Sequence, residues 1–160
     1  FFLDKDPEKA ARYQCNKHVV KMILESAQLL STAHHEAQSE YTPLVYKKTH
    51  VNHPSNIWTR ASIGNYEWLF DHFVALCDEY TVRYNKEHKT FTDRVEVLAI
   101  IPDLPDLGFT NPALAMPDEC KCDDFVESYR RYYRLKEKTI DMRWPNEKPF
   151  FMLEQVKELL

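Results

Sequence analysis

Glycine is scarce in this sequence, with 2 Gly against 9 Pro among 160 residues. The tightest hairpin turns need residues that accept a positive φ, so a fold of many strands would have little material for its turns here. Helices joined by proline-punctuated loops are the expected organisation. Neither G-x-G-x-x-G nor G-x-x-x-x-G-K occurs, which argues against nucleotide-dependent chemistry on the usual glycine-rich phosphate loops.

Long apolar runs and a disulfide framework are also missing. No apolar run approaches the roughly 18 residues that cross a bilayer, and no signal-peptide pattern opens the chain. The four cysteines are too few and too unevenly spaced for a secreted disulfide scaffold. Cys120 and Cys122 are closer together than the usual zinc-binding pairs. We therefore expect a cytoplasmic protein, of a bacterium or a phage-infected cell, with no membrane partner and no bound metal.

Apolar residues recur at helical spacing over three long segments. These segments are residues 16–38, 55–84 and 123–140. Shorter helices are expected at 92–100 and 150–160, and there is no repeat or linker that would divide residues 1–160. The predicted fold class is mostly α: a compact single domain of three long helices, with shorter helices and irregular Pro-rich connections. The residues expected to share its core are Val20, Ile23, Ala27, Leu30, Leu69, Phe73, Leu76, Tyr80 and Tyr133.

The helix expected at 16–38 is apolar around most of its circumference and keeps one narrow polar strip. The strip consists of His18, Lys21, Glu25, Gln28 and Thr32. At 100° per residue, His18, Glu25 and Thr32 project within about 20° of one another. A carboxylate on a mostly buried helix is a candidate acid–base group. The alternative is that Glu25 is a solvated glutamate opposite the core stripe.

Basic side chains gather in two segments, although the net charge is −4. Residues 41–60 contain lysine, arginine and histidine but no acid, and residues 129–150 contain seven lysines and arginines against three acids. The series Tyr129–Arg134 and Trp144 offers cations for phosphates and rings for base stacking. We expect both segments to face the same side and to bind DNA. Evenly solvated surfaces, with the tyrosines in the core, are the alternative.

Histidines suggest a different chemistry. His50 and His53 could converge in a compact loop, and with His18 and nearby acids they would suit a metal-dependent phosphohydrolase. Histidines near lysines in a loop are also ordinary polar packing, so both interpretations stay open. His34 and His35 project about 100° apart on a helix and cannot share one metal ion.

Several short motifs occur in the same order as in a known family. His18-Val-Val-Lys-Met-Ile-Leu-Glu25 resembles a histidine followed seven residues later by a catalytic glutamate, and Asn52-His53-Pro54 resembles an Asn-His-Pro segment. The later similarities lie at residues 69–85, 116–119, 134–138 and 143–151. By these motifs the chain resembles the pyrimidine-dimer DNA glycosylase/AP-lyase family, of the endonuclease V type, and within it a phage-like member. Leu24 and Gln28 stand where the family has arginines.

The resemblance implies a DNA repair enzyme that needs no metal or organic cofactor. Its nucleophile would be the N-terminal amine, here that of Phe1, which attacks C1′ of a damaged nucleotide and expels the base through a Schiff base. Glu25 would stabilise the developing positive charge and transfer protons. The partner would be double-stranded DNA, with the oligomeric state open, and the alternative from another class is a helical module that binds nucleic acid or protein without catalysis. The residues expected to contact DNA are His18, Lys21, His50, His53, Arg130, Arg134, Lys138 and Trp144.

Overall fold

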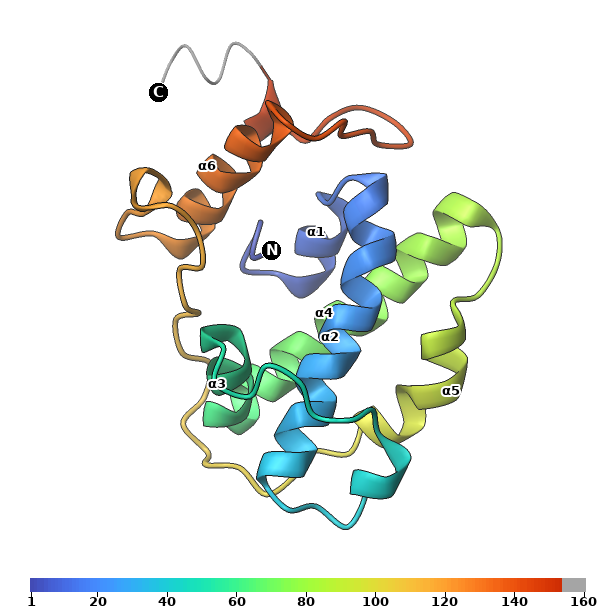
Figure 1. Cartoon of the computed structure of the whole chain (residues 1–160). Coiled ribbons are helices and arrows are strands. Elements are labelled where there is room, and N and C mark those ends of the chain that lie inside the picture. The colour runs from blue at the N-terminus through green and yellow to red at the C-terminus, as the bar shows by residue number, and fades with distance from the viewer. Residues whose placement is uncertain (154–160) are drawn as a thin grey trace.

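Helices and irregular connections make up the whole described part of the chain, residues 1–153, in a computed structural model (Figure 1). The α-helices are α1 (Pro7–Arg12), α2 (Asn16–Glu36), α3 (Pro54–Ala61), α4 (Ile63–Tyr84), α5 (Lys89–Leu98) and α6 (Phe125–Glu137). Short 3-10 turns occupy Thr42–Leu44, Asp118–Cys120 and Phe150–Met152. These residues contain no strand, so the expected mostly helical class is confirmed. Most of the helix expected at 150–160 lies outside the described residues.

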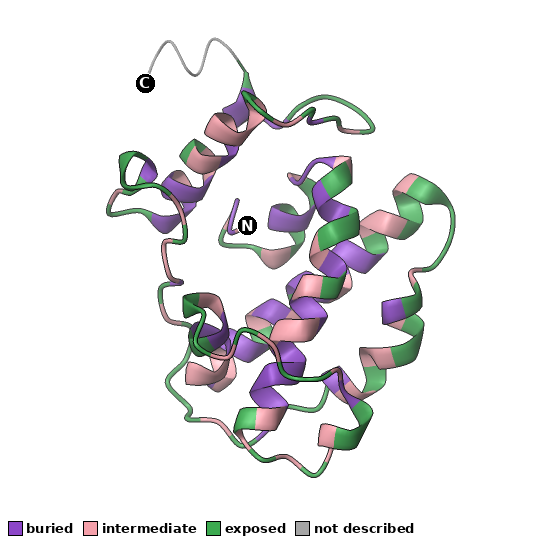
Figure 2. Ribbon diagram, in the orientation of Figure 1, coloured by how far each residue is buried: buried purple, intermediate pink, exposed green. Residues whose placement is uncertain are grey.

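The crossing of α2 and α4 forms the centre of the fold, and α1 packs on α4 (Figure 1). Figure 2 shows buried residues concentrated where these helices meet the N-terminal segment. On α2 the buried stripe includes Val19, Ile23 and Leu30. The prediction that Val20 lies in the core is wrong, because this residue is 39 % exposed, and Leu24 is exposed as well. Both sides of this helix are apolar, so only the position of α4 decides which side is buried.

The expected second helix is divided at Ser62 into α3 and α4. Ser62 has an extended backbone, and its hydroxyl accepts from the N–H of Gly64 and donates to the carbonyl of Gly108. A side chain at Gly64 would collide with the backbone of Gly108 and Phe109. Glycine therefore allows the proline-rich segment to cross the start of α4, which is a tertiary requirement that helix propensity does not reveal.

Helix starts follow the local capping chemistry. Asp6 caps α1 through the N–H of Glu8, and Asp124 caps α6 through the N–H of Val126. His53 caps α3, since its ring nitrogen accepts from the N–H of Ser55 while Pro54 takes the first helical position. Within the described residues, no helix is long and apolar enough to span a membrane.

The N-terminal segment enters the space between α6 and the α2–α4 pair (Figure 1). Leu3 is fully buried, and its carbonyl accepts from the guanidinium of Arg130, which also pairs with Asp4 at 3.2 Å. Tyr133 of α6 is buried as expected, whereas Tyr80 of α4 is only partly buried at the edge of the core. These contacts hold Phe1 between α2 and α6.

Candidate active site

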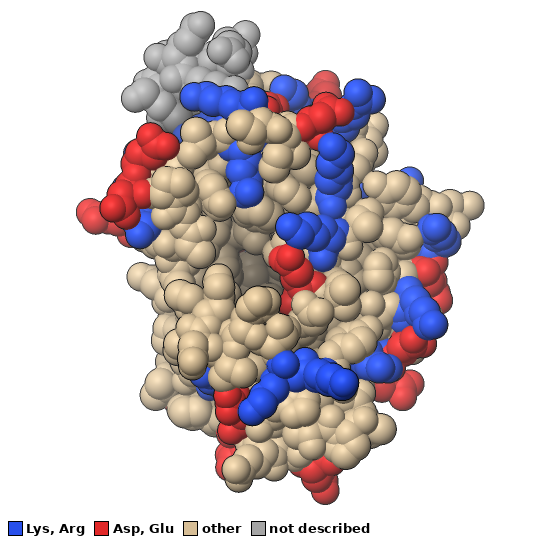
Figure 3. Space-filling model, viewed as in Figure 1, with Lys and Arg blue, Asp and Glu red and all other residues tan. Residues whose placement is uncertain are grey.

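A pocket of about 270 Å³ opens where the N-terminus, α2, α3, α4 and α6 meet. The molecular surface is hollowed near the place where Figure 1 puts the N-terminus, as Figure 3 shows. Both basic segments border this pocket: residues 41–60 contribute Ser55 and Trp58, and residues 129–150 contribute Tyr129 and Lys136. Lysine and arginine side chains gather around the hollow, over α2, α6 and the segment before α3 (Figure 3). Each segment thus contributes residues to this pocket, and their binding of DNA stays a prediction.

The amino group of Phe1 is buried in this pocket. The Phe1 ring stacks on His18 at 4.7 Å between centroids and meets Tyr133 edge-on at 5.2 Å. Burial lowers the pKa of the amino group from 8.0 to about 6, while the negative charge of Glu25 acts in the opposite direction. Most of this amine is therefore the unprotonated, nucleophilic form at pH 7.

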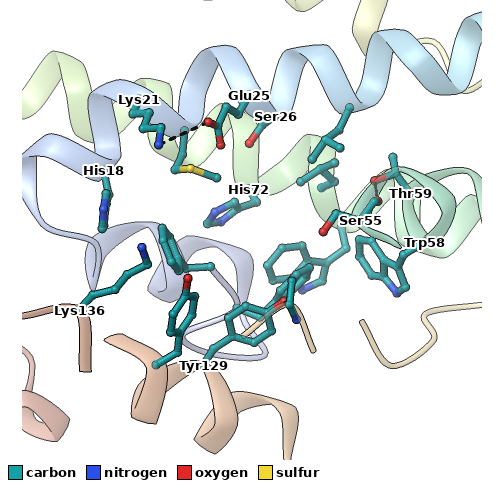
Figure 4. A pocket seen from close by; sticks show the side chains of 18 of the residues that line it. His18, Lys21, Glu25, Ser26, Ser55, Trp58, Thr59, His72, Tyr129 and Lys136 are labelled. Carbon is teal, nitrogen blue, oxygen red and sulfur yellow. Dashed lines mark hydrogen bonds and ion pairs between the residues drawn. The ribbon is translucent and has the colours of Figure 1, made fainter. Parts of the chain in front are cut away.

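Glu25 lies on the pocket wall formed by α2, and Figure 4 shows it beside Ser26. Its carboxylate is 3.7 Å from the ammonium group of Lys21, and the two side chains are 44 % and 67 % exposed. An ion pair this exposed contributes little to stability. Because the Glu25 side chain is partly exposed, its carboxylate is accessible to a ligand in the pocket. Of the predicted polar strip, His18, Lys21 and Glu25 line this pocket, whereas Gln28 lines an adjoining cavity and Thr32 is buried.

His18 is a buried, neutral ring. Its Nδ1 is 2.8 Å from the hydroxyl of Tyr133, which also accepts from the N–H of Cys15 at 2.8 Å. Because the hydroxyl accepts from Cys15, its own proton is best donated to His18, which places the imidazole proton on Nε2. Burial, and then the positive charges of Lys136 and the amino group, lower the His18 pKa to about 4. A neutral His18 supports the Phe1 ring and does not supply a cation for phosphate.

His72 of α4 is a second buried histidine on the pocket, and sequence reasoning missed it. Its Nδ1 donates to the carbonyl of Pro7 at 2.9 Å, its Nε2 accepts from the amide of Gln14, and its ring stacks on Trp68. Burial and the nearby amino group lower its pKa to about 3. His72 sits among apolar residues of α4 at helical spacing, and its place beside Phe1 depends on how α1 packs on α4.

Lys136 of α6 is a charged pocket residue that the sequence did not single out. Its ammonium group lies 4.9 Å from the ring centre of Tyr132 and 5.9 Å from that of Phe1. Lys136 and Lys21 therefore place cations from two different helices on the same pocket (Figure 4). The sequence signals were its place among seven basic residues of 129–150 and within the family similarity at 134–138.

The remaining basic and aromatic candidates of the C-terminal region lie elsewhere. Arg130 is held by Leu3 and Asp4, and Arg134 donates to Glu127 and to the Phe151 carbonyl. Lys138 is exposed beside a different cavity, which Arg134 also lines. Trp144 donates from its indole nitrogen to the carbonyl of Tyr13. The structure does not bring these four residues to the pocket of Phe1.

His50 and His53 border an adjoining cavity of about 330 Å³ that shares Glu25 with the first pocket. His53 caps α3, and His50 has a positive φ of 48° with its carbonyl accepting from Asn56. Within residues 1–153, no group of three or more His, Cys, Asp or Glu side chains is arranged to hold a metal ion. The two histidines thus converge near Glu25 without forming a metal cluster in this part of the chain.

The helical fold and the shared pocket of Phe1 and Glu25 define a protein whose N-terminus and α2 form one site. A family model described as pyrimidine dimer DNA glycosylase matches residues 1–92, more than half of the chain. The chain belongs to the pyrimidine dimer DNA glycosylase family, a DNA repair family whose substrate is DNA. No curated protein and no solved structure matches it. The matched region includes Phe1, Glu25 and His72, whereas Lys136 and all of α6 lie beyond it.

Proposed function

We propose that the protein is a DNA glycosylase with AP-lyase activity that acts on damaged or modified pyrimidines in double-stranded DNA. The observation that carries this proposal is the buried amino group of Phe1 in the same pocket as the accessible carboxylate of Glu25. The proposal applies to a chain whose first residue is Phe1, because any residue before it would convert the amine into an amide.

The chemistry follows from these two groups. The Phe1 nitrogen bonds to C1′ of the damaged nucleotide, the glycosidic bond breaks, and the base leaves with the bonding electrons and a proton. The C1′–O4′ bond then breaks, O4′ takes a proton from solvent to become the 4′ hydroxyl, and an iminium ion joins C1′ to the Phe1 nitrogen. Loss of a proton from C2′ then expels the 3′ phosphate by β-elimination. Glu25 stabilises the positive charge of the iminium and accepts the proton.

Cations around the pocket supply the phosphate contacts. Lys21 and Lys136 line the pocket, and Lys47 and Lys48 lie exposed on the segment before α3. Where the family has arginines, Leu24 projects to solvent and Gln28 lines the adjoining cavity. Lys136 supplies from α6 a positive charge that those arginines would have supplied from α2. The exposed His50 and His53 lie close enough to Glu25 to contact the same strand.

The test is covalent trapping on duplex DNA with one abasic site, using an untagged chain that begins at Phe1. Borohydride should reduce the Schiff base to a stable protein–DNA adduct through the α-amine. Glu25→Gln should lower strand cleavage by about 100-fold or more, because the amide neither carries charge nor accepts a proton, while DNA affinity stays within about twofold. Glu36→Gln, an exposed glutamate at the end of the same helix, is the matched control and should cleave normally.

Two results would contradict the proposal. DNA binding without any adduct would support a non-catalytic DNA-binding module. Cleavage by Glu25→Gln at the rate of the unmodified protein would remove Glu25 from the mechanism.

A further inference from the structure

Three carbonyl groups near the N-terminus accept hydrogen bonds from side chains of other helices. They are alternate carbonyls, those of residues 3, 5 and 7, between Phe1 and the first residue of α1. The bonds run from the guanidinium of Arg130 to Leu3 at 2.9 Å, from the indole of Trp68 to Lys5 at 2.7 Å, and from the imidazole of His72 to Pro7 at 2.9 Å. The first residues of a domain are usually poorly ordered unless such contacts hold them. The main chain behind the Phe1 amine is therefore fixed by both α6 and α4.

Two of the three donors form a pair on α4. Trp68 and His72 are one helical turn apart, and their rings stack at 5.1 Å between centroids. The ring of Phe2 packs on Trp68 at 4.9 Å, and Leu3 is fully buried. Helix α4 thus holds both the backbone and a side chain of the N-terminal segment.

His72 has no ring nitrogen left for the substrate. Its Nδ1 donates to the carbonyl of Pro7, and its Nε2 accepts from the side-chain amide of Gln14 at 3.1 Å. Burial, and then the positive charge of the Phe1 amino group, lower the pKa of His72 to about 3, so the ring is neutral at pH 7. His72 lines the same pocket as Phe1. A neutral ring with both nitrogens bonded to the protein cannot exchange a proton with DNA, so its role is to hold the segment in place.

We infer that His72 and Trp68 are positioning residues for the reaction, because their bonds to Pro7 and Lys5 keep the amine of Phe1 in the pocket. The inference rests on the proposed function, in which this amine attacks C1′ of the nucleotide. Such an attack needs the two atoms about 3–3.5 Å apart and aligned. A segment ordered before DNA arrives brings the nitrogen to that position without a further loss of conformational entropy.

Two substitutions at residue 72 separate the two hydrogen bonds of the imidazole. In His72→Asn the amide nitrogen takes the place of Nδ1 and still donates to Pro7, whereas the bond with Gln14 is lost. In His72→Gln the amide group reaches the place of Nε2 and pairs with Gln14, whereas the donor to Pro7 is lost. Both amides are neutral, like the imidazole that they replace, so neither substitution changes the charge of the pocket.

The first measurement uses the untagged protein, beginning at Phe1, without DNA. The pH dependence of labelling by acetic anhydride, followed by mass spectrometry of the N-terminal peptide, gives the pKa of the amino group. The unmodified protein should show the pKa of about 6 that burial sets. His72→Gln should raise this pKa toward 8.0, because the released amine becomes solvated, whereas His72→Asn should leave it near about 6.

The second measurement is the single-turnover rate of borohydride trapping on abasic duplex DNA at saturating protein. A rise of the amine pKa from about 6 to 8.0 lowers the unprotonated fraction roughly tenfold at pH 7, so His72→Gln should lose about that much rate or more. At pH 9 the part of the loss that comes from protonation should disappear. The dissociation constant for DNA should stay within about twofold, since no charge changes.

The other titratable groups that line the pocket are unchanged in these variants. Of these, Glu25 raises the pKa of the amine and so opposes the effect of burial. The full set is His18, Lys21 and Glu25 on α2, and Tyr129, Tyr132 and Lys136 on α6.

His34→Gln is the matched control for the loss of a buried histidine. His34 is also fully buried with both ring nitrogens bonded, to Ser39 at 2.9 Å and to Tyr66 at 3.0 Å, but it does not line the pocket. This variant should lower the melting temperature without changing the amine pKa or the trapping rate.

Trp68→Phe tests the neighbouring bond and serves if His72→Gln does not fold. It removes the donor to Lys5 and keeps a ring against Phe2. It should raise the amine pKa in the same direction as His72→Gln.

The outcomes separate the inference from the function on which it rests. An unchanged amine pKa in His72→Gln or in Trp68→Phe, an equal rise in His72→Asn and His72→Gln, or an equal rise in His34→Gln would overturn the inference. Absence of any adduct between the unmodified protein and abasic DNA would instead overturn the proposed function, and the amine pKa would still show whether α4 positions the amine.

Discussion

The two sides of α6 carry similar cations in different surroundings. Facing the pocket, the Lys136 ammonium lies over the rings of Tyr132 and Phe1. Beside the cavity on the other side, the Arg134 guanidinium contacts the carboxylate of Glu127 at 2.9 Å and a backbone carbonyl at 3.1 Å, and its side chain is only 13 % exposed. Rings attract a cation weakly and leave it able to approach an anion, whereas a carboxylate already neutralises it. The side chains around each basic residue of this helix, and not its residue type, therefore decide which one is available to bind a phosphate group.

The largest expected effect concerns the N-terminus, on the pocket side of this comparison. One extra residue before Phe1 should abolish the borohydride adduct with abasic DNA, because an amide nitrogen is not nucleophilic and the new amine would lie outside the pocket. Gel analysis of trapped complexes measures this, with removal of the extra residue by an aminopeptidase as the rescue. An adduct of undiminished yield with the extended chain would point to a lysine side chain as the nucleophile.

The pH dependence of adduct formation should reflect the burial of the Phe1 amino group. Since the amino-group pKa is lowered to about 6, the rate of trapping should rise about tenfold per unit below pH 6 and level off above it. Single-turnover rates at saturating protein between pH 5 and 9 measure this. If the rate levels off only near pH 8, the amine is solvated.

The stability of the fold should decrease as the pH falls, because the Phe1 amine, His18 and His72 are buried. The folded pKa of the amine, about 6, lies below its unfolded value of 8.0, so the unfolded state binds more protons between these values and stability falls as pH drops through them. His18 and His72, at about 4 and about 3 against 6.5 when unfolded, extend this loss to lower pH. Urea unfolding from pH 8 to pH 4 should lose on the order of 3 kcal/mol or more. A flat profile would place these groups in solvent.

Removing one cation from each side of α6 should affect DNA binding on one side and the stability of the fold on the other. Lys136→Met should reduce the salt dependence of DNA binding by about one unit of slope with little change in melting temperature. Arg134→Met should leave the slope unchanged and lower stability by about 1–3 kcal/mol, because Glu127 and the Phe151 carbonyl lose a charged donor. Titrations at several salt concentrations and thermal melts measure the two effects. The reverse assignment would contradict the comparison.

The smallest effect on stability is expected at Lys21. Its exposed ion pair with Glu25 should contribute less than about 0.5 kcal/mol, so Lys21→Met should leave the melting temperature within error. DNA affinity at low salt should still fall, since Lys21 borders the pocket. A clear loss of stability would show that the ion pair supports α2.

Local chemistry determined much of the fold. Apolar spacing placed the first and third long helices within three residues of the bounds of α2 and α6, and the second over α3 and α4 together. The angular spacing of His18 and Glu25 placed both on one side of α2, where they border one pocket. These features depend on residues a few positions apart, which a sequence displays directly. Their roles in catalysis stay predictions.

Only the tertiary structure decided which distant residues are in contact and which titratable groups are charged. The break at Ser62 and the need for Gly64 come from a segment about 45 residues away, and the exposure of Val20 comes from where α4 packs. The neutrality of His18 and His72 and the lowered pKa of the amine arise from desolvation, which has no signature along the chain. The pocket itself joins Phe1, α2 and Lys136, residues more than 100 positions apart. Burial and long-range contact are properties of the packed chain, so Lys136 could be identified as a pocket cation only from the tertiary structure, whereas Lys21 was identified from the sequence.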